Sequence, residues 1–269
     1  MAIITLTSDY GSKDYFISSI KGSILKRLPL AVIVDISHEI TPFHLGECAY
    51  ILRNSYPHFP DQTIHIIGLD SEKNEEKSHI IAKVENQYFI GTDGGLFSLL
   101  FQEKKPEKII KIDLNEKMID STFPMKHIFT QIACEIEQGQ NIENFGKEIK
   151  NFTYNKKSIP TLKTDPINKT RSIIGEVIYI DRFGNAITNI SKQYFKKTIE
   201  KNSFVILGRE NQKISKISKK YSDVTEGNIL ALFNSANLLE ISIMRRNTSE
   251  LGANTLLGIH EKDNILIDF

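Results

Sequence analysis

The strongest constraint on the fold is a regular alternation of strand-like and helix-like segments over the first part of the chain. Three apolar runs rich in β-branched residues cover residues 2–7, 31–36 and 63–69. Between them, residues 17–28 and 45–56 carry apolar side chains at helical spacing. Strands that alternate with helices in this way are typical of parallel pairing, with the helices packed on the sheet. We therefore expect an N-terminal α/β domain with a mostly parallel sheet.

The rest of the chain predicts a second domain of a different class. Further strands are expected at 79–84, 88–90 and 108–112, with helices near 96–101 and 129–137. Residues 147–172 are then rich in Lys, Asn, Thr and Pro, without apolar periodicity. Beyond them, short strands are separated by turns, which favours a small antiparallel β-barrel or sandwich. We predict an α/β domain at 1–150, a connection at 151–172 and a β domain at 173–269.

Composition excludes several classes of protein. The 269 residues include 34 Lys and Arg against 33 Asp and Glu, so no concentrated basic face for nucleic acid is expected. No apolar run reaches the length of a membrane span, and the first residues lack the pattern of a signal peptide. We expect a cytoplasmic protein. Cys48 and Cys134 lie in apolar helical patterns and are predicted to be buried free thiols.

Polar residues follow the three N-terminal strands at the points where the strands end. They are Asp9, His38 and Asp70. Because ligands bind beyond the carboxyl ends of parallel strands, three such residues at one edge favour a binding site. The alternative for either aspartate alone is a structural cap of a turn or helix.

The segment DRFGN at 181–185 is a second candidate, between two strands of the C-terminal part. Gly-Asn alone would form an ordinary hairpin turn. The Asp181 carboxylate can also accept hydrogen bonds from a ribose diol, the Phe183 ring can stack on a base, and the Asn185 amide can bind polar edges. Both interpretations, a turn and a nucleoside site, stay open at this stage.

Other common motifs are missing from the sequence. GTDGG at 91–95 lacks the spacing of a phosphate-binding loop, so we interpret it as a turn. There is no HExxH, CxxC or GxSxG segment, and the seven histidines are scattered. We therefore predict neither a metal nor a bound cofactor.

An ordered set of motifs resembles the S-adenosylmethionine hydroxide adenosyltransferases, a family related to the bacterial fluorinases and chlorinases. TSDYG at 7–11 is similar to the family's T-D-F-G, and VDISHEITP at 34–42 to its D-I-[ST]-H-x-[IV]-x-P. DRFGN at 181–185, followed by ITNI, resembles D-x-F-G-N-x-x-T-N-I. YSDV at 221–224 and the segment 234–241 fit later motifs, so the resemblance runs nearly from end to end.

The resemblance implies a reaction and an assembly. Members of the family displace methionine from C5′ of the adenosyl group, and in the hydrolase branch water or hydroxide is the nucleophile. The products are adenosine and L-methionine. The leaving group departs neutral, so the protein must hold the ribose, align the nucleophile and exclude bulk water. In the family the site lies between subunits of a trimer, which implies a homotrimer here, with S-adenosyl-L-methionine as substrate rather than as a cofactor.

The resemblance also implies roles for individual residues. The carboxylates of Asp9 and Asp181 would accept hydrogen bonds from the ribose hydroxyls, and the Phe183 and Tyr221 rings would lie against adenine. The Asn185 amide and the Ser235 hydroxyl would contact the methionine end or the ribose. The implied substrate-binding residues are Asp9, Phe123, Asp181, Phe183, Asn185, Tyr221 and Ser235.

The segments that would activate water depart from the family pattern. The family's D-P-G-V-G-T-x-R reads DSEKNEEK at 70–77, which keeps Asp70 and puts Lys77 at the Arg position. The family's F-H-G-R-D reads FPMKH at 123–127, so Pro124 replaces the histidine and His127 follows three residues later. Residues three apart share a helix face, and a helix N-terminus keeps an imidazole neutral. We hypothesise that Asp70, Lys77 and His127 orient and deprotonate the attacking water.

Hydrolysis of S-adenosyl-L-methionine is the leading interpretation, with three alternatives. The altered loop and the replaced histidine are compatible with a non-catalytic protein that binds S-adenosyl-L-methionine or adenosine. A halide transferase is disfavoured because halide enzymes carry an uncharged residue where this chain has Asp70. A different nucleotide-binding enzyme is the fallback.

Overall fold

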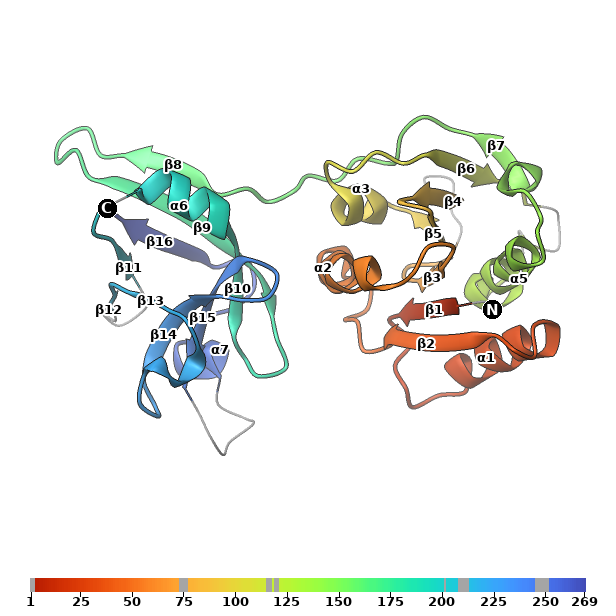
Figure 1. Ribbon diagram of the computed structural model, residues 1–269, viewed down its shortest axis with the longest axis horizontal. Helices are drawn as coiled ribbons and strands as arrows, with labels where there is room; N and C mark the ends of the chain where they lie inside the picture. The colour runs from red at the N-terminus through yellow and green to blue at the C-terminus, as the bar shows by residue number, and fades with distance from the viewer. Residues whose placement is uncertain are drawn as a thin grey trace. The chain divides into compact units, whose positions relative to one another are not determined.

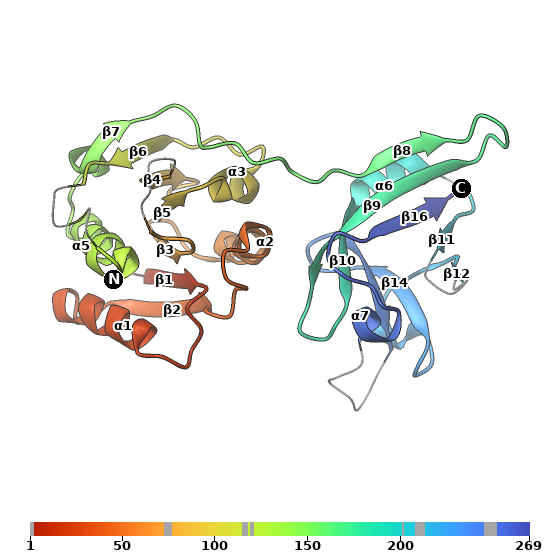
Figure 2. The ribbon, with the colours of Figure 1, turned by 180° about the vertical axis from the view of Figure 1, so that it is seen from behind.

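The computed structural model describes residues 3–72, 77–114, 118, 121–200, 202–207, 213–244 and 252–269. The chain divides into two compact units, Met1–Lys157 and Ser158–Phe269. Figures 1 and 2 trace the elements of each unit along the chain. Among the described residues, none of the helices combines the length and the apolar character that crossing a membrane would need.

The first unit contains a mixed sheet whose described strands have the order β2-β1-β3-β5-β4-β6-β7. The strands β1, β2, β3 and β5 pair in parallel, whereas β4, β6 and β7 are added in antiparallel fashion. Their bounds are β1 Ile3–Ser8, β2 Val32–Ser37, β3 Ile64–Gly68, β4 Ser78–Val84, β5 Gln87–Asp93, β6 Lys108–Ile112 and β7 Gly146–Glu148. The expected α/β class is confirmed, and its parallel half carries the three strand ends that the sequence singled out.

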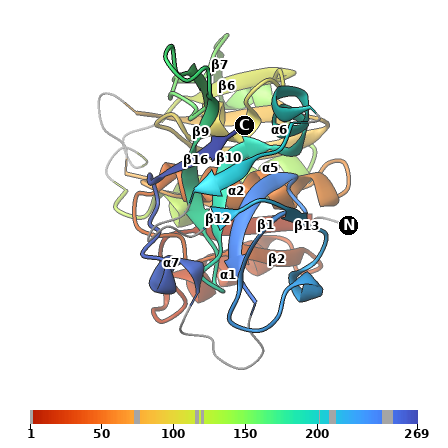
Figure 3. The same cartoon turned by 90° about the vertical axis from the view of Figure 1, so that its left-hand side faces the viewer.

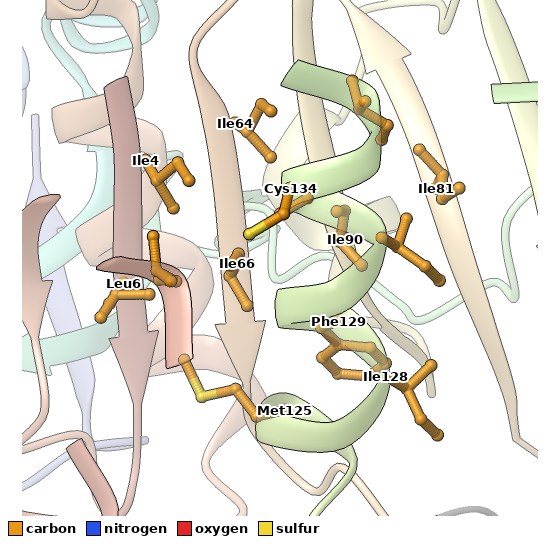
Figure 4. Packing of buried hydrophobic residues seen from close by; sticks show 14 of the residues in the cluster. Ile4, Leu6, Ile64, Ile66, Ile81, Ile90, Met125, Ile128, Phe129 and Cys134 are labelled. Atoms are coloured by element: carbon orange, nitrogen blue, oxygen red, sulfur yellow. The ribbon is translucent and has the colours of Figure 1, made fainter. Parts of the chain in front are cut away.

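Helices cover both faces of this sheet. On one face, α1 and α5 enclose a core with the strands; on the other face, α2 and α3 do the same. Figure 4 shows Met125, Phe129 and Cys134 directed from one helical segment toward Leu6, Ile64 and Ile66 of the sheet. The bounds are α1 Phe16–Arg27, α2 Leu45–Ser55, η1 Tyr56–His58, α3 Leu96–Phe101, η2 Met125–Phe129, α5 Thr130–Glu137 and η3 Ile142–Phe145.

The apolar runs of the sequence form the strands, and their aliphatic side chains supply the two cores that flank the sheet. Ile4, Leu6 and Ile66 have no exposed surface. Cys48 and Cys134 are free and buried, as predicted.

The second unit is a predominantly antiparallel, nearly closed, barrel-like sheet, which confirms the predicted class (Figure 3). The order of its described strands is β12-β11-β16-β9-β10-β15-β14-β13, with β8 paired to β9. The strand bounds are β8 Thr161–Thr164, β9 Arg171–Ile180, β10 Ala186–Ser191, β11 Val205–Leu207, β12 Lys213–Ile214, β13 Ile217–Ser218, β14 Ile229–Phe233, β15 Leu238–Ile243 and β16 Asn264–Asp268. Its helical segments are α6 Lys192–Ile199, η5 Tyr221–Asp223 and α7 Ala253–Leu256.

Candidate functional site

The two strand-end aspartates of the first unit lie close together. β1 and β3 are neighbours in the sheet, with Ser8 paired to Gly68, so Asp9 and Asp70 follow at the same edge. Burial raises the pKa of Asp9, and the nearby charge of Asp70 raises it further. The opposing effect comes from backbone N–H donors, among them that of Phe43, which donates to Asp9 Oδ2 at 3.0 Å.

His38 directly follows β2, and its side chain is buried. Its Nδ1 lies 2.8 Å from Ser8 Oγ, and its Nε2 lies 3.2 Å from Asp35 Oδ1. Asp35 in turn pairs with Lys21 at 2.5 Å. The contact of Nε2 with Asp35 has an ion-pair distance but no hydrogen-bond geometry, so the bond between Nδ1 and Ser8 Oγ is the one that anchors the ring. His38 therefore connects the last residue of β1, next to Asp9, to the end of β2.

Lys77 contacts Asp70, so the structure brings together two of the three residues expected to activate water. The Lys77 ammonium is paired with Asp70 Oδ2. Asp70 has a left-handed backbone conformation, with φ of 45°, which is unusual for a residue other than glycine. Residues 73–76 of the altered loop lie outside the described residues.

His127 is placed differently from the sequence-based expectation. It lies on a π-helix, η2, rather than on an α-helix, and its side chain is exposed whereas Met125, Ile128 and Phe129 of the same turn are buried. Its Nδ1 lies 2.9 Å from Ser121 Oγ, and its ring packs against Phe123 at 6.0 Å between centroids. Pro124 is buried while His127 is exposed, so the two residues occupy different environments.

Phe123 joins an aromatic cluster beside Asp9. Its ring lies edge-on to Tyr10 at 5.6 Å and to Phe16 at 5.4 Å. Tyr10 and Phe16 also contact each other at 5.7 Å. Tyr10 and Phe16 were missed as site residues, although the position of Tyr10 directly after a strand-end carboxylate is a signal that could have indicated it.

In the second unit, Asp181 binds groups of its own turn. Its Oδ1 accepts hydrogen bonds from the backbone N–H of Phe183 at 2.8 Å and of Asn185 at 2.9 Å. Its Oδ2 accepts from Asn185 Nδ2 at 2.9 Å. Gly184 supplies the positive φ of 75° that the turn requires. The segment 181–185 therefore forms a turn, in which the Phe183 side chain is 68% exposed.

Two buried residues behind this turn, Ser242 and Glu240, were not named as site residues from the sequence. The Ser242 hydroxyl donates to Asn185 Oδ1 at 2.5 Å, and the Tyr221 hydroxyl donates to Glu240 Oε1 at 2.8 Å. Burial raises the pKa of Glu240; the Tyr221 hydrogen bond opposes that rise, and the charge of Asp181 adds to it. The signal in the sequence was a pair of polar residues two positions apart in an otherwise apolar strand, which points them to one face.

Ser235 lies exposed in the turn between β14 and β15. Asn234 shapes this turn, because its Oδ1 accepts from the backbone N–H of Ala236 at 3.0 Å and of Leu238 at 3.2 Å. The Ser235 side chain is therefore accessible to a ligand, whereas the Asn234 side chain stabilises the turn.

The described residues offer a defined chemistry. The first unit presents carboxylates, an ammonium group and aromatic rings near one sheet edge, which suits polar hydroxyls and a water molecule. The second unit presents the exposed Phe183 ring and the partly exposed Tyr221 ring, which suit a planar heterocycle. The Asn185 amide, in contrast, is buried and bonded to Asp181 and Ser242. Within the parts of the chain that the structure describes, no group of three or more His, Cys, Asp or Glu side chains could hold a metal ion.

Comparison with protein families gives two matches that together span most of the chain. Residues 4–146 match the N-terminal domain of the S-adenosylmethionine (SAM) hydroxide adenosyltransferases. Residues 175–266 match the C-terminal domain of the same family.

Individual relatives agree with these matches. A protein of Methanocaldococcus jannaschii named (R)-S-adenosyl-L-methionine hydrolase is 32% identical over 260 residues, covering 93% of this chain and 91% of the relative. A Thermus thermophilus protein of the same name is 25% identical over 93% of this chain and 95% of its own.

Solved structures share the fold. A crystal structure of an uncharacterized conserved protein from Thermotoga maritima superposes with a TM-score of 0.83 and 27% identity, over 98% of this chain and 99% of the other. A conserved hypothetical protein from Thermus thermophilus, 22% identical, has a TM-score of 0.73 over 99% of both chains. With both domain models matched in order and a relative at 32% identity along nearly its whole length, this chain belongs to the SAM hydroxide adenosyltransferase family.

Proposed function

We propose that the protein hydrolyses (R)-S-adenosyl-L-methionine to adenosine and L-methionine. The observation that carries the proposal is the 32% identity, over 93% of the chain, to a relative that bears this activity in its name. The carboxylates of Asp9 and Asp70 also support it, because they lie close together and can bind hydroxyl groups and water; Asp70 forms an ion pair with Lys77.

The reaction is an in-line substitution at C5′ of the ribose. The oxygen of water forms a bond to C5′, the bond from C5′ to sulfur breaks, and sulfur keeps the electron pair as the neutral thioether of methionine. The water gives up one proton. Because the leaving group needs no acid, the demand on the protein is to hold the ribose and to align the water.

Asp9 and Asp70 divide these tasks in our proposal. The Asp9 carboxylate accepts hydrogen bonds from ribose hydroxyls, and Asp70 orients the attacking water. Lys77 contacts Asp70 and holds its carboxylate in place. His127, exposed and with its Nδ1 2.9 Å from Ser121 Oγ, is proposed as the proton acceptor.

Residues of the second unit bind the rest of the substrate in this proposal. The exposed Phe183 ring and Tyr221 face adenine, while Asn185 and Ser235 contact the methionine end or the ribose. Asp181 holds the turn that presents them and accepts from a ribose hydroxyl. Phe123 packs beside the adenosyl group.

We also propose a cytoplasmic homotrimer whose sites lie at subunit interfaces, with no cofactor. Light scattering at micromolar concentration tests the assembly. A monomer that binds adenosine at full affinity would contradict it.

The activity is tested with purified protein and each sulfonium epimer of S-adenosyl-L-methionine separately. We expect adenosine, followed by chromatography, from the (R) epimer. The Asp70→Ala variant should release none while its affinity for adenosine in calorimetry stays close to that of the parent. Binding without release by the parent would favour the non-catalytic alternative, and 5′-halogenated adenosine in the presence of chloride or fluoride would favour a halide transferase.

A further inference from the structure

Asp70 is held in a conformation that its own backbone disfavours. Its φ of 45° lies in the left-handed region, where side chains other than glycine persist only when their surroundings fix them. The position of the Asp70 carboxylate therefore depends on what holds the residues beside it.

Ser71, the next residue, is held by hydrogen bonds to both its side chain and its backbone. Its Oγ lies 2.8 Å from the hydroxyl of Tyr10, and its carbonyl oxygen accepts a hydrogen bond from His79 Nε2 at 2.9 Å. Ser71 itself is 7% exposed. Tyr10 follows β1 and His79 lies in β4, so the segment after Asp70 is tied to two different strands of the sheet.

The two anchors are themselves fixed by packing. The Tyr10 ring packs against both Phe16 and Phe123, and the buried His79 ring stands edge-on to Phe129 at 4.8 Å between centroids. Gly68 leaves room for two side chains, because a Cβ there would overlap Met125 Sδ and would lie 3.2 Å from the Tyr10 hydroxyl oxygen. Burial raises the pKa of Tyr10 to about 12, so its hydroxyl keeps its proton throughout the neutral range.

We infer that Tyr10 is a positioning residue that fixes the Asp70 carboxylate through its hydroxyl bond to Ser71. The inference rests on the proposed function, in which Asp70 orients the attacking water. An aromatic ring that served packing alone would not need the hydroxyl. Since phenylalanine keeps the contacts with Phe16 and Phe123, removing the oxygen atom separates positioning from packing.

The experiment compares Tyr10→Phe, Ser71→Ala and the double variant with the parent in adenosine release from (R)-S-adenosyl-L-methionine. We expect kcat to fall at least tenfold in each, with KM changed less than twofold, because small misplacements of a reacting group cost about that much or more. The double variant should be no slower than either single variant, because one bond is lost in all three.

Tyr56→Phe is the matched control. The Tyr56 hydroxyl bonds to Glu85 at 3.1 Å and to Lys104 at 2.7 Å, so this variant also loses hydrogen bonds of a buried tyrosine. It should keep the parent kcat and KM, whatever its effect on the urea midpoint.

Three results overturn the inference and can be told apart. If the parent is active and Tyr10→Phe keeps its kcat, or if the two single effects multiply in the double variant, Tyr10 does not position Asp70 through Ser71. If the parent itself releases no adenosine, the proposed function fails and this inference falls with it.

Discussion

The buried His65 of β3 leads us to predict a loss of stability in mild acid. His65 has no exposed surface, and its Nδ1 lies 2.7 Å from Thr5 Oγ1 and its Nε2 2.6 Å from Gln87 Oε1. Because Gln87 donates its own amide to the Phe59 carbonyl at 3.0 Å, its oxygen is left to accept from His65 Nε2. The neutral ring satisfies both neighbours, and burial lowers the pKa of His65 to about 4.

The sign of the effect follows from the two states. In the unfolded chain His65 binds a proton near its ordinary pKa of 6.5, whereas the folded protein resists protonation until about 4. Stability from this group is therefore complete above 6.5 and falls as the pH drops toward 4. Each pH unit within that window costs about 1.4 kcal/mol. Going from pH 7 to pH 5 should lower the free energy of unfolding by about 2 kcal/mol through this residue alone.

Urea unfolding followed by circular dichroism at pH 7, 6 and 5 measures this contribution. His65→Gln removes the titration, so this variant should be less stable than the parent at pH 7 but should lose about 2 kcal/mol less between pH 7 and pH 5. The exposed His58 gives the control, because His58→Gln should keep the slope of the parent. Equal slopes for the parent and His65→Gln would refute the assignment of a buried neutral ring.

Three further predictions concern the candidate site. Asp9→Asn should weaken adenosine binding by roughly 10- to 100-fold, the loss of a charge-assisted hydrogen bond, and unchanged calorimetric affinity would remove Asp9 from the site. Asp181→Asn should lower the free energy of unfolding by about 1–3 kcal/mol, because its new amide would face Asn185 Nδ2, donor against donor; an unchanged urea midpoint would show that the turn tolerates it. His127→Ala should lower kcat at least tenfold, within the roughly 10²–10⁴ that a general base contributes, and a rate equal to the parent across pH 6–9 would exclude it.

The sequence predicted β1 to β6 well because each is a short apolar run ended by polar or turn residues, whereas the short β7, with the sequence GKE, was not predicted. It could not predict their directions in the second half of the sheet. β4 and β5 form a hairpin through Glu85 and Asn86, which both have positive φ, of 51° and 60°. A tight turn of this kind usually signals itself by glycine, and glutamate gives no such signal.

For the site, topology made the placement of Asp9 and Asp70 predictable, because parallel neighbours end at one edge. The internal hydrogen bonds of the Asp181 turn could not be read from the residue types, which suit a turn and a ligand equally. The π-helical turn that carries His127 was also beyond prediction, since one additional residue in a helical turn leaves no mark on composition.

The departures of this chain from the family pattern are not independent of one another. The family motifs have phenylalanine after the first aspartate and proline after the strand-end aspartate; this chain has Tyr10 and Ser71, and the two hydroxyls lie 2.8 Å apart. A proline restricts the backbone by itself, whereas serine does so only through a partner. In the family pattern the proline ring restricts this part of the backbone; here the hydrogen bond between the Tyr10 and Ser71 hydroxyls restricts it instead.

Lys77 retains contact with Asp70, so the Asp70 carboxylate is still held in place and its negative charge still faces a positive one. Loss of catalysis would leave no requirement for either contact, and their joint presence favours an active enzyme over a non-catalytic descendant.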